Sequence, residues 1–181
     1  MGPIELLFIC LAIVLGFVGL ARGFLRELGV TTLVVFLIFM LEQFETPIGK
    51  GLDFLIGIVN ISALHGAEAN LVRFMFYLVV IVAVALVSYI GETLTFGGTL
   101  PRGPHWTLLG LMAGLWNGYL IIGSIWYYMH VFHYPISLWG LFNEPLSPLA
   151  MRLVQLLPES LIPSVGFLGL AAFLLIMRVV R

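Results

Sequence analysis

Charge-free apolar stretches alternate along the chain with short segments that are rich in charged residues, glycine and proline. The four clearest stretches cover residues 6–21, 28–41, 74–91 and 106–129. A helix needs about 20 apolar residues to cross roughly 30 Å of hydrocarbon. With their flanks, these stretches predict four transmembrane helices at approximately 4–21, 27–46, 73–92 and 106–129.

The stretch 28–41 is the shortest of the four, and its β-branched and aromatic residues would also suit a buried strand. An open strand in hydrocarbon leaves backbone N–H and C=O groups unpaired, whereas a helix pairs them internally. The first stretch lacks the basic N-terminal region and the small-residue cleavage site of a secretion signal, so we interpret it as a retained span. The expected fold class is an all-α membrane protein.

The segments outside these spans contain most of the prolines and many of the glycines. We expect a short interfacial or re-entrant helix within 52–64, and a proline-rich stretch, 135–163, along the membrane surface with a short amphipathic helix at 149–157. The last apolar stretch, 160–177, contains Pro163, which suits the first turn of a helix. This fifth hydrophobic helix either crosses the bilayer or lies in its interface.

Composition excludes several classes of protein. The chain is 61% apolar and 9% charged over 181 residues, whereas soluble domains carry about 25% charged residues. The formal net charge of −1 provides no basic surface for nucleic acid, whose binding depends on phosphate neutralisation. Cys10 is the single cysteine, so no internal disulfide can form. We therefore expect a multi-pass protein in a lipid bilayer.

Arginines near the span ends set the expected orientation. Arg22 and Arg26 lie in the short turn between the first two spans, and Arg102 lies in the turn between the third and fourth. Short loops that carry Lys and Arg stay on the cytoplasmic side. The sequence therefore predicts that the Arg22 and Arg26 side is cytoplasmic and that the N-terminus is outside.

Glycines recur at intervals of four residues in the first and fourth spans. This spacing lets two helix backbones approach closely. We predict that the two spans pack antiparallel through these glycines. The candidate helix-packing residues are Gly16, Gly19, Gly23, Gly110, Gly114 and Gly118.

The run from Arg22 to Glu27 reads Arg-Gly-Phe-Leu-Arg-Glu and resembles the signature of the CvpA family, the colicin V production proteins. The candidate motif residues are Arg22, Gly23, Phe24, Arg26 and Glu27. The later glycine ladder is similar to that family's second motif, although Asn117 stands where the family usually has arginine. The resemblance implies a CvpA-like transmembrane domain over 1–134, followed at 135–181 by the proline-rich interfacial segment and the C-terminal hydrophobic helix.

Ionisable residues at membrane depth are functional candidates because burial there is costly. Arg22, Glu92 and Glu42 are the candidates for an ion pair or an ion pathway, and we favour structural pairing or snorkelling at the interface over a pathway. His130 and His133 lie three residues apart at the end of the fourth span, but no other span contains a histidine to complete a haem site. We therefore expect no metal, no cofactor and, in the absence of a catalytic motif, no enzyme.

The resemblance implies a multi-pass protein of the bacterial inner membrane, in a family linked to toxin export and to tolerance of envelope stress. Our leading hypothesis is a non-enzymatic protein that acts through helix association, as a homo-oligomer or with other membrane proteins. A small oligomeric channel or transporter is one alternative. An accessory subunit of an energy-converting membrane complex is another.

Overall fold

The computed structural model describes residues 4–58, 66–91, 94, 96, 103–139 and 147–179. Nearly all of these residues are helical, and no strand occurs among them. The elements are α1 (Ile4–Arg22), α2 (Phe24–Gln43), α3 (Glu45–Ile58), α4 (Ala67–Ile90), α5 (Pro104–Val131), the 3-10 helix η1 (Pro135–Trp139), α6 (Pro148–Val154), α7 (Pro158–Leu161) and α8 (Ser164–Val179).

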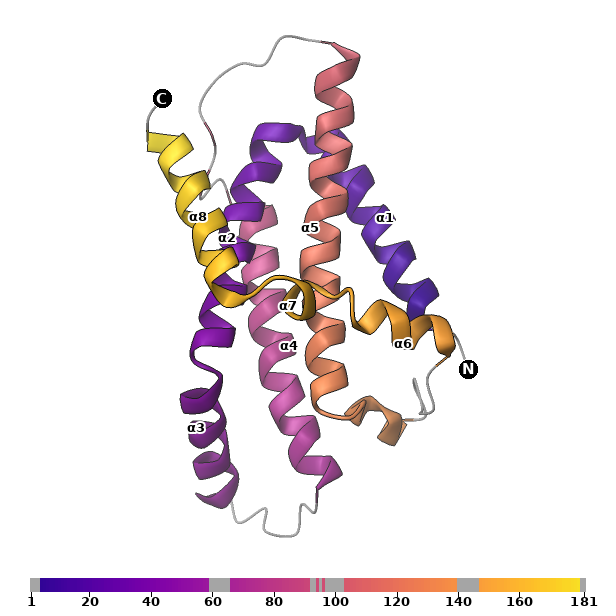
Figure 1. Cartoon of the computed structure of the whole chain (residues 1–181), viewed down its shortest axis with the longest axis vertical. Coiled ribbons are helices and arrows are strands. Elements are labelled where there is room, and N and C mark those ends of the chain that lie inside the picture. Colours follow the sequence, from indigo (N-terminus) through magenta and orange to yellow (C-terminus); the bar gives the residue numbers. More distant parts are fainter. Residues whose placement is uncertain are drawn as a thin grey trace.

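The helices α1, α2, α4 and α5 are long and apolar enough to cross a membrane. The structure thus confirms the all-α fold class, with four candidate spans and a shorter apolar helix at the C-terminal end. Helix α8 has 16 residues, which corresponds to about 24 Å. It runs beside α2 and ends at the same end of the bundle as the junction between α1 and α2 (Figure 1).

Local sequence explains where the elements begin and end. Gly23 separates α1 from α2 with a φ of 88°, which glycine adopts without steric cost. Helix α3 begins directly after Phe44 rather than within the expected segment 52–64, since Pro47 falls in its first turn, where proline is tolerated. Residues 59–65 of that expectation lie outside the described residues. Pro104, Pro148 and Pro158 each stand at the start of a helix.

Helix α5 lies at the centre of the bundle and contacts α1, α2 and α4 (Figure 1). Its Leu120, Trp126 and Tyr128 are buried. The ring of Tyr128 stacks on that of Tyr77 from α4 with a centroid separation of 4.1 Å. The large side chains of α5 therefore fill the core on one side, while its glycines allow a close approach on another.

The segment that contains α6 and α7 crosses the bundle, and α8 then runs along α2 (Figure 1). The Ser147 hydroxyl caps α6 by accepting from the Ala150 N–H at 3.0 Å, and it donates to Glu5 Oε1 of α1 at 2.7 Å. Helix α6 covers most of the segment 149–157, where one short helix was expected, and Pro158 then starts a further helix, α7, after Leu157.

Candidate functional site

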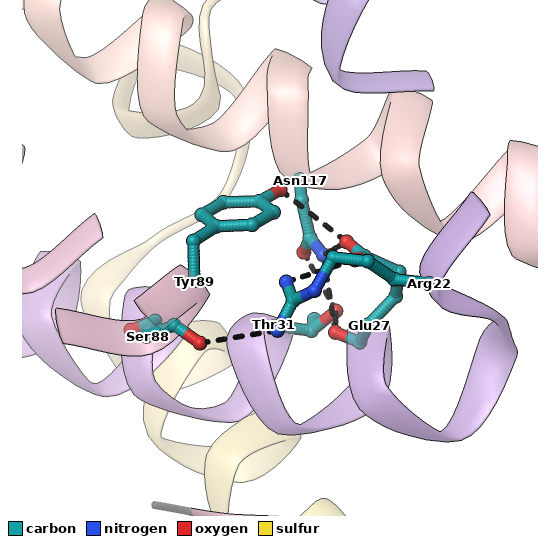
Figure 2. A network of polar contacts seen from close by, with 6 residues as sticks. All are labelled: Arg22, Glu27, Thr31, Ser88, Tyr89 and Asn117. Carbon is teal, nitrogen blue, oxygen red and sulfur yellow. Dashed lines mark hydrogen bonds and ion pairs between the residues drawn. The ribbon is translucent and has the colours of Figure 1, made fainter. Parts of the chain in front are cut away.

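A buried ion pair stands at the junction of α1 and α2. Arg22 is the last residue of α1, and Glu27 lies in the first turn of α2. The turn at Gly23 brings the two side chains together, so that Arg22 Nη1 donates to Glu27 Oε1 at 3.1 Å (Figure 2). The arginine side chain is 20% exposed and that of Glu27 is 0% exposed, so the pair reaches from the protein surface into its core.

The second carboxylate oxygen of Glu27 accepts hydrogen bonds from two other helices. Asn117 Nδ2 of α5 donates to Glu27 Oε2 at 2.8 Å, and the Tyr89 hydroxyl of α4 donates to the same oxygen at 3.3 Å. A buried carboxylate is strongly destabilising unless both a cation and hydrogen bonds compensate it. Glu27 has both kinds of partner.

Asn117 is itself fully buried and is held on both sides of its amide. Its Nδ2 also lies 3.0 Å from the backbone oxygen of Glu27. The Thr31 hydroxyl lies 2.7 Å from Asn117 Oδ1 and 2.9 Å from the Glu27 backbone oxygen. Because a hydroxyl has one proton, it donates to one of these two acceptors at a time. The amide of Asn117 thereby connects α5 to one turn of α2.

The guanidinium of Arg22 makes further contacts with α4. Its Cζ lies 4.6 Å from the centroid of the Tyr89 ring, within the range of a cation–π interaction. Its Nη2 lies 3.5 Å from the backbone oxygen of Ser88. We call these residues the Glu27 network: Arg22, Glu27, Thr31, Ser88, Tyr89 and Asn117 (Figure 2). It connects all four candidate spans.

Close backbone contact between α1 and α5 positions the Glu27 network. A Cβ added to Gly114 would lie 2.5 Å from the Leu15 backbone oxygen, and one added to Gly19 would lie 2.5 Å from the Gly110 oxygen. A Cβ added to Gly118 would lie 2.9 Å from the Ala12 Cα and 3.0 Å from the Ala12 backbone oxygen. These contacts are with backbone, which cannot rotate away, so larger residues would separate the two helices. Asn117 lies between Gly114 and Gly118 in the sequence, so the segment of α5 that contacts α1 also carries the amide that bonds to Glu27 of α2.

Two other proposed packing glycines, Gly16 and Gly23, do not contact the backbone of a neighbouring helix in this way. Gly16 faces the Leu115 side chain, which lies 2.7 Å from where a Cβ would stand. A Cβ on Gly23 would meet nothing within 4 Å, so the part that Gly23 plays is the turn between the helices.

The proposed pathway residues are not brought together in the described part of the chain. Glu92 lies outside the described residues. Glu42 lies near the other end of α2, about 22 Å from Glu27 along the helix axis. Between them α2 buries Val34, Val35 and Ile38. The remaining motif residues lie beside the ion pair, with Phe24 half-buried and Arg26 exposed.

The histidines at the end of α5 do not form a metal site in the part of the chain that the structure describes, where no group of three or more metal-ligating residues occurs. His130 Nδ1 lies 3.2 Å from the Tyr134 hydroxyl, which also accepts from Trp126 Nε1 at 3.2 Å. His133 is exposed and takes a positive φ of 58° in the turn after α5.

Sequence reasoning missed four members of the network: Thr31, Ser88, Tyr89 and Asn117. A signal existed for Asn117, because a side-chain amide in a span needs a partner in the same bundle. The hydroxyls of Thr31 and Tyr89 gave no such signal, since a hydroxyl in a span can hydrogen-bond to a backbone carbonyl of its own helix or to groups at the membrane interface.

Comparison of the chain with protein-family models, with curated protein sequences and with solved structures finds no match.

Proposed function

We propose that the chain is a non-enzymatic, CvpA-like integral membrane protein that acts by associating with other membrane proteins in export or envelope homeostasis. The supporting observation is that the motif residues Arg22 and Glu27 form an ion pair inside the helix bundle. Arg22 and Glu27 bond to one another and, through Ser88, Tyr89 and Asn117, to α4 and α5. A conducting path would need such groups to face water, whereas here they hold the helices together.

The glycine faces support a more specific form of this hypothesis. Gly19, Gly114 and Gly118 are covered inside the chain by the contact between α1 and α5. A partner would therefore contact the outward surface of the bundle rather than the glycines. On α1 that surface is apolar and includes Val14 and Phe17, which are 54% and 61% exposed.

Mass measurement of the protein extracted from its native membrane tests this proposal. We expect a stoichiometric assembly with further membrane-protein chains, which survives extraction and can be identified from the masses of its components. Phe17→Ala should weaken the assembly if α1 carries the contact, whereas Gly49→Ala provides a control on α3, where a Cβ would meet nothing within 4 Å.

Two results would contradict the proposal. A monomer that carries only lipid under the same extraction would exclude a stable assembly. Ion flux through liposomes that contain the pure protein, lost in Arg22→Ala while the helical circular dichroism spectrum is retained, would favour the channel instead. Recovery of the chain within an energy-converting complex would support association and identify the accessory-subunit role.

A further inference from the structure

A second buried polar group lies where α7 packs against α5. Glu159 is in the first turn of α7, and Pro158 of that turn lies against Gly123, where an added Cβ would be 2.6 Å from the proline Cδ. The Tyr119 hydroxyl fixes the preceding turn by donating to the Leu156 backbone oxygen at 2.7 Å. These contacts place the Glu159 carboxyl beside Ser124 of α5, and its charge acts on Tyr128 of the same helix.

The side-chain oxygens of these three residues are buried without hydrogen-bond partners in the described part of the chain. They are Glu159 Oε1 and Oε2, Ser124 Oγ and the Tyr128 hydroxyl. Ser124 is 0% exposed and Tyr128 is 2% exposed. The Ser124 hydroxyl lies beside the carboxylate, yet their geometry does not make a hydrogen bond. We call Glu159, Ser124 and Tyr128 the Glu159 cluster. Buried polar atoms are normally paired, so a cluster of orphans indicates a missing partner.

The charges around the Glu159 cluster are acidic. The ionisable groups that act on Glu159, or on which it acts, are Glu42 of α2 and Tyr119, Tyr127 and Tyr128 of α5. Tyr77 of α4 acts on Tyr128, whereas the exposed Arg152 of α6 is not among the groups that act on Glu159. Burial raises the pKa of the Glu159 carboxyl, the Ser124 hydroxyl lowers it, and Glu42 raises it.

We propose that the Glu159 cluster is a proton-binding site, in which Glu159 keeps the proton and its carboxyl O–H donates a hydrogen bond to the hydroxyl of Ser124 or Tyr128. Protonation removes the one full charge of the cluster and converts an acceptor-only carboxylate into a donor. The neighbouring hydroxyls can then accept from it and donate in turn. The site would make the docking of α7 on α5 depend on pH.

A proton fits this cluster better than a metal ion does. The cluster supplies four orphan side-chain oxygens, two of them from a single carboxylate. Calcium takes 6–8 oxygen ligands, and magnesium requires near-octahedral coordination. A divalent ion would also leave the cluster with excess positive charge. Sodium has the right charge, and the experiment separates it from a proton.

Infrared spectroscopy of the reconstituted protein as a function of pH tests the proposal. We expect a protonated-carboxyl band that persists at least one pH unit above the ordinary glutamate midpoint of about 4.3. In a Glu42→Gln background, where the neighbouring carboxyl of α2 cannot contribute, the isosteric variant Glu159→Gln should lack this band, and Glu68→Gln, at an exposed position on α4, should retain it.

Three outcomes would overturn the assignment. The first is a band that disappears at the ordinary midpoint. The second is a band that persists unchanged in Glu159→Gln. The third is loss of the band at constant pH when sodium replaces an equal concentration of N-methylglucamine, which would identify a sodium site. If Glu159→Gln does not fold, Glu159→Asp provides a second test. This variant retains a carboxyl group at position 159, so its protonated-carboxyl band should still titrate with pH.

Discussion

Glu27 and Glu159 both place a carboxylate inside the bundle, but their surroundings differ. Glu27 accepts from an arginine, an amide and a tyrosine hydroxyl that come from three other helices. Glu159 has no hydrogen-bond partner in the described part of the chain, and Glu42 is the charged residue that acts on it. A buried carboxylate can be compensated by an opposite charge or by uptake of a proton. The structure provides the first solution beside Asn117, at the middle of α5, and calls for the second further along the same helix, beside Ser124.

Loss of the Glu27 carboxylate should have the largest effect. Glu27→Ala leaves Arg22, Tyr89 and Asn117 without their common acceptor, and removal of one member of a buried ion pair costs about 3–5 kcal/mol. We expect a loss of this size in the free energy of unfolding, measured in mixed micelles. The exposed pair of Arg73 and Asp53, 2.7 Å apart, is the matched control, and Asp53→Ala should cost less than about 1 kcal/mol. Equal losses in the two variants would contradict this comparison.

The stability of the protein should fall as the pH rises, because of Glu159. Burial raises the pKa of its carboxyl from 4.5 to about 7 in the folded protein. The folded state therefore binds the proton more tightly, and this stabilisation is complete below pH 4.5 and lost as the pH rises to about 7. The difference corresponds to roughly 3 kcal/mol. Unfolding titrations of wild type and Glu159→Gln should diverge across this range, and parallel curves would exclude the effect.

A methyl group at the glycine contact should disturb the Glu27 network from a distance. Gly114→Ala forces α1 and α5 apart, and overpacking of this kind costs about 1–3 kcal/mol. Because Asn117 moves with α5, the variant should also weaken the bond between Asn117 and Glu27. A double-mutant cycle with Asn117→Ala measures this coupling. Strict additivity of the two losses would show that the contact and the network are independent.

Removal of the Tyr89 hydroxyl should have the smallest effect. Its hydrogen bond to Glu27 is 3.3 Å long, and Asn117 and Arg22 still bond to the carboxylate in Tyr89→Phe. The ring also remains available to the guanidinium. We expect a loss of about 1 kcal/mol in the free energy of unfolding. A loss as large as that of Glu27→Ala would mean that the hydroxyl, rather than the arginine, compensates the charge.

The sequence was sufficient for those features that depend on segment length and local spacing. Four apolar stretches indicated four spans, because hydrocarbon thickness sets helix length. Arg22 and Arg26 marked the short turn between the first two spans, and thereby one end of the bundle. The sequence did not indicate that Asn117 would bond to Glu27 or that Glu159 would lie beside Ser124, since these pairs are remote in sequence. Glu159 becomes buried where Pro158 packs against Gly123, a contact that the periodicity of the sequence does not predict.

The hydrogen bond between Glu5 and Ser147 joins residues 142 positions apart in the chain. During synthesis, the first turn of the first helix is made long before the serine that satisfies its carboxylate. Until Ser147 is made, the Glu5 carboxylate needs water or lipid headgroups as hydrogen-bond partners. The order in which the polypeptide emerges from the ribosome thus delays the final packing of the first turn of α1 until the segment that contains Ser147 has been made.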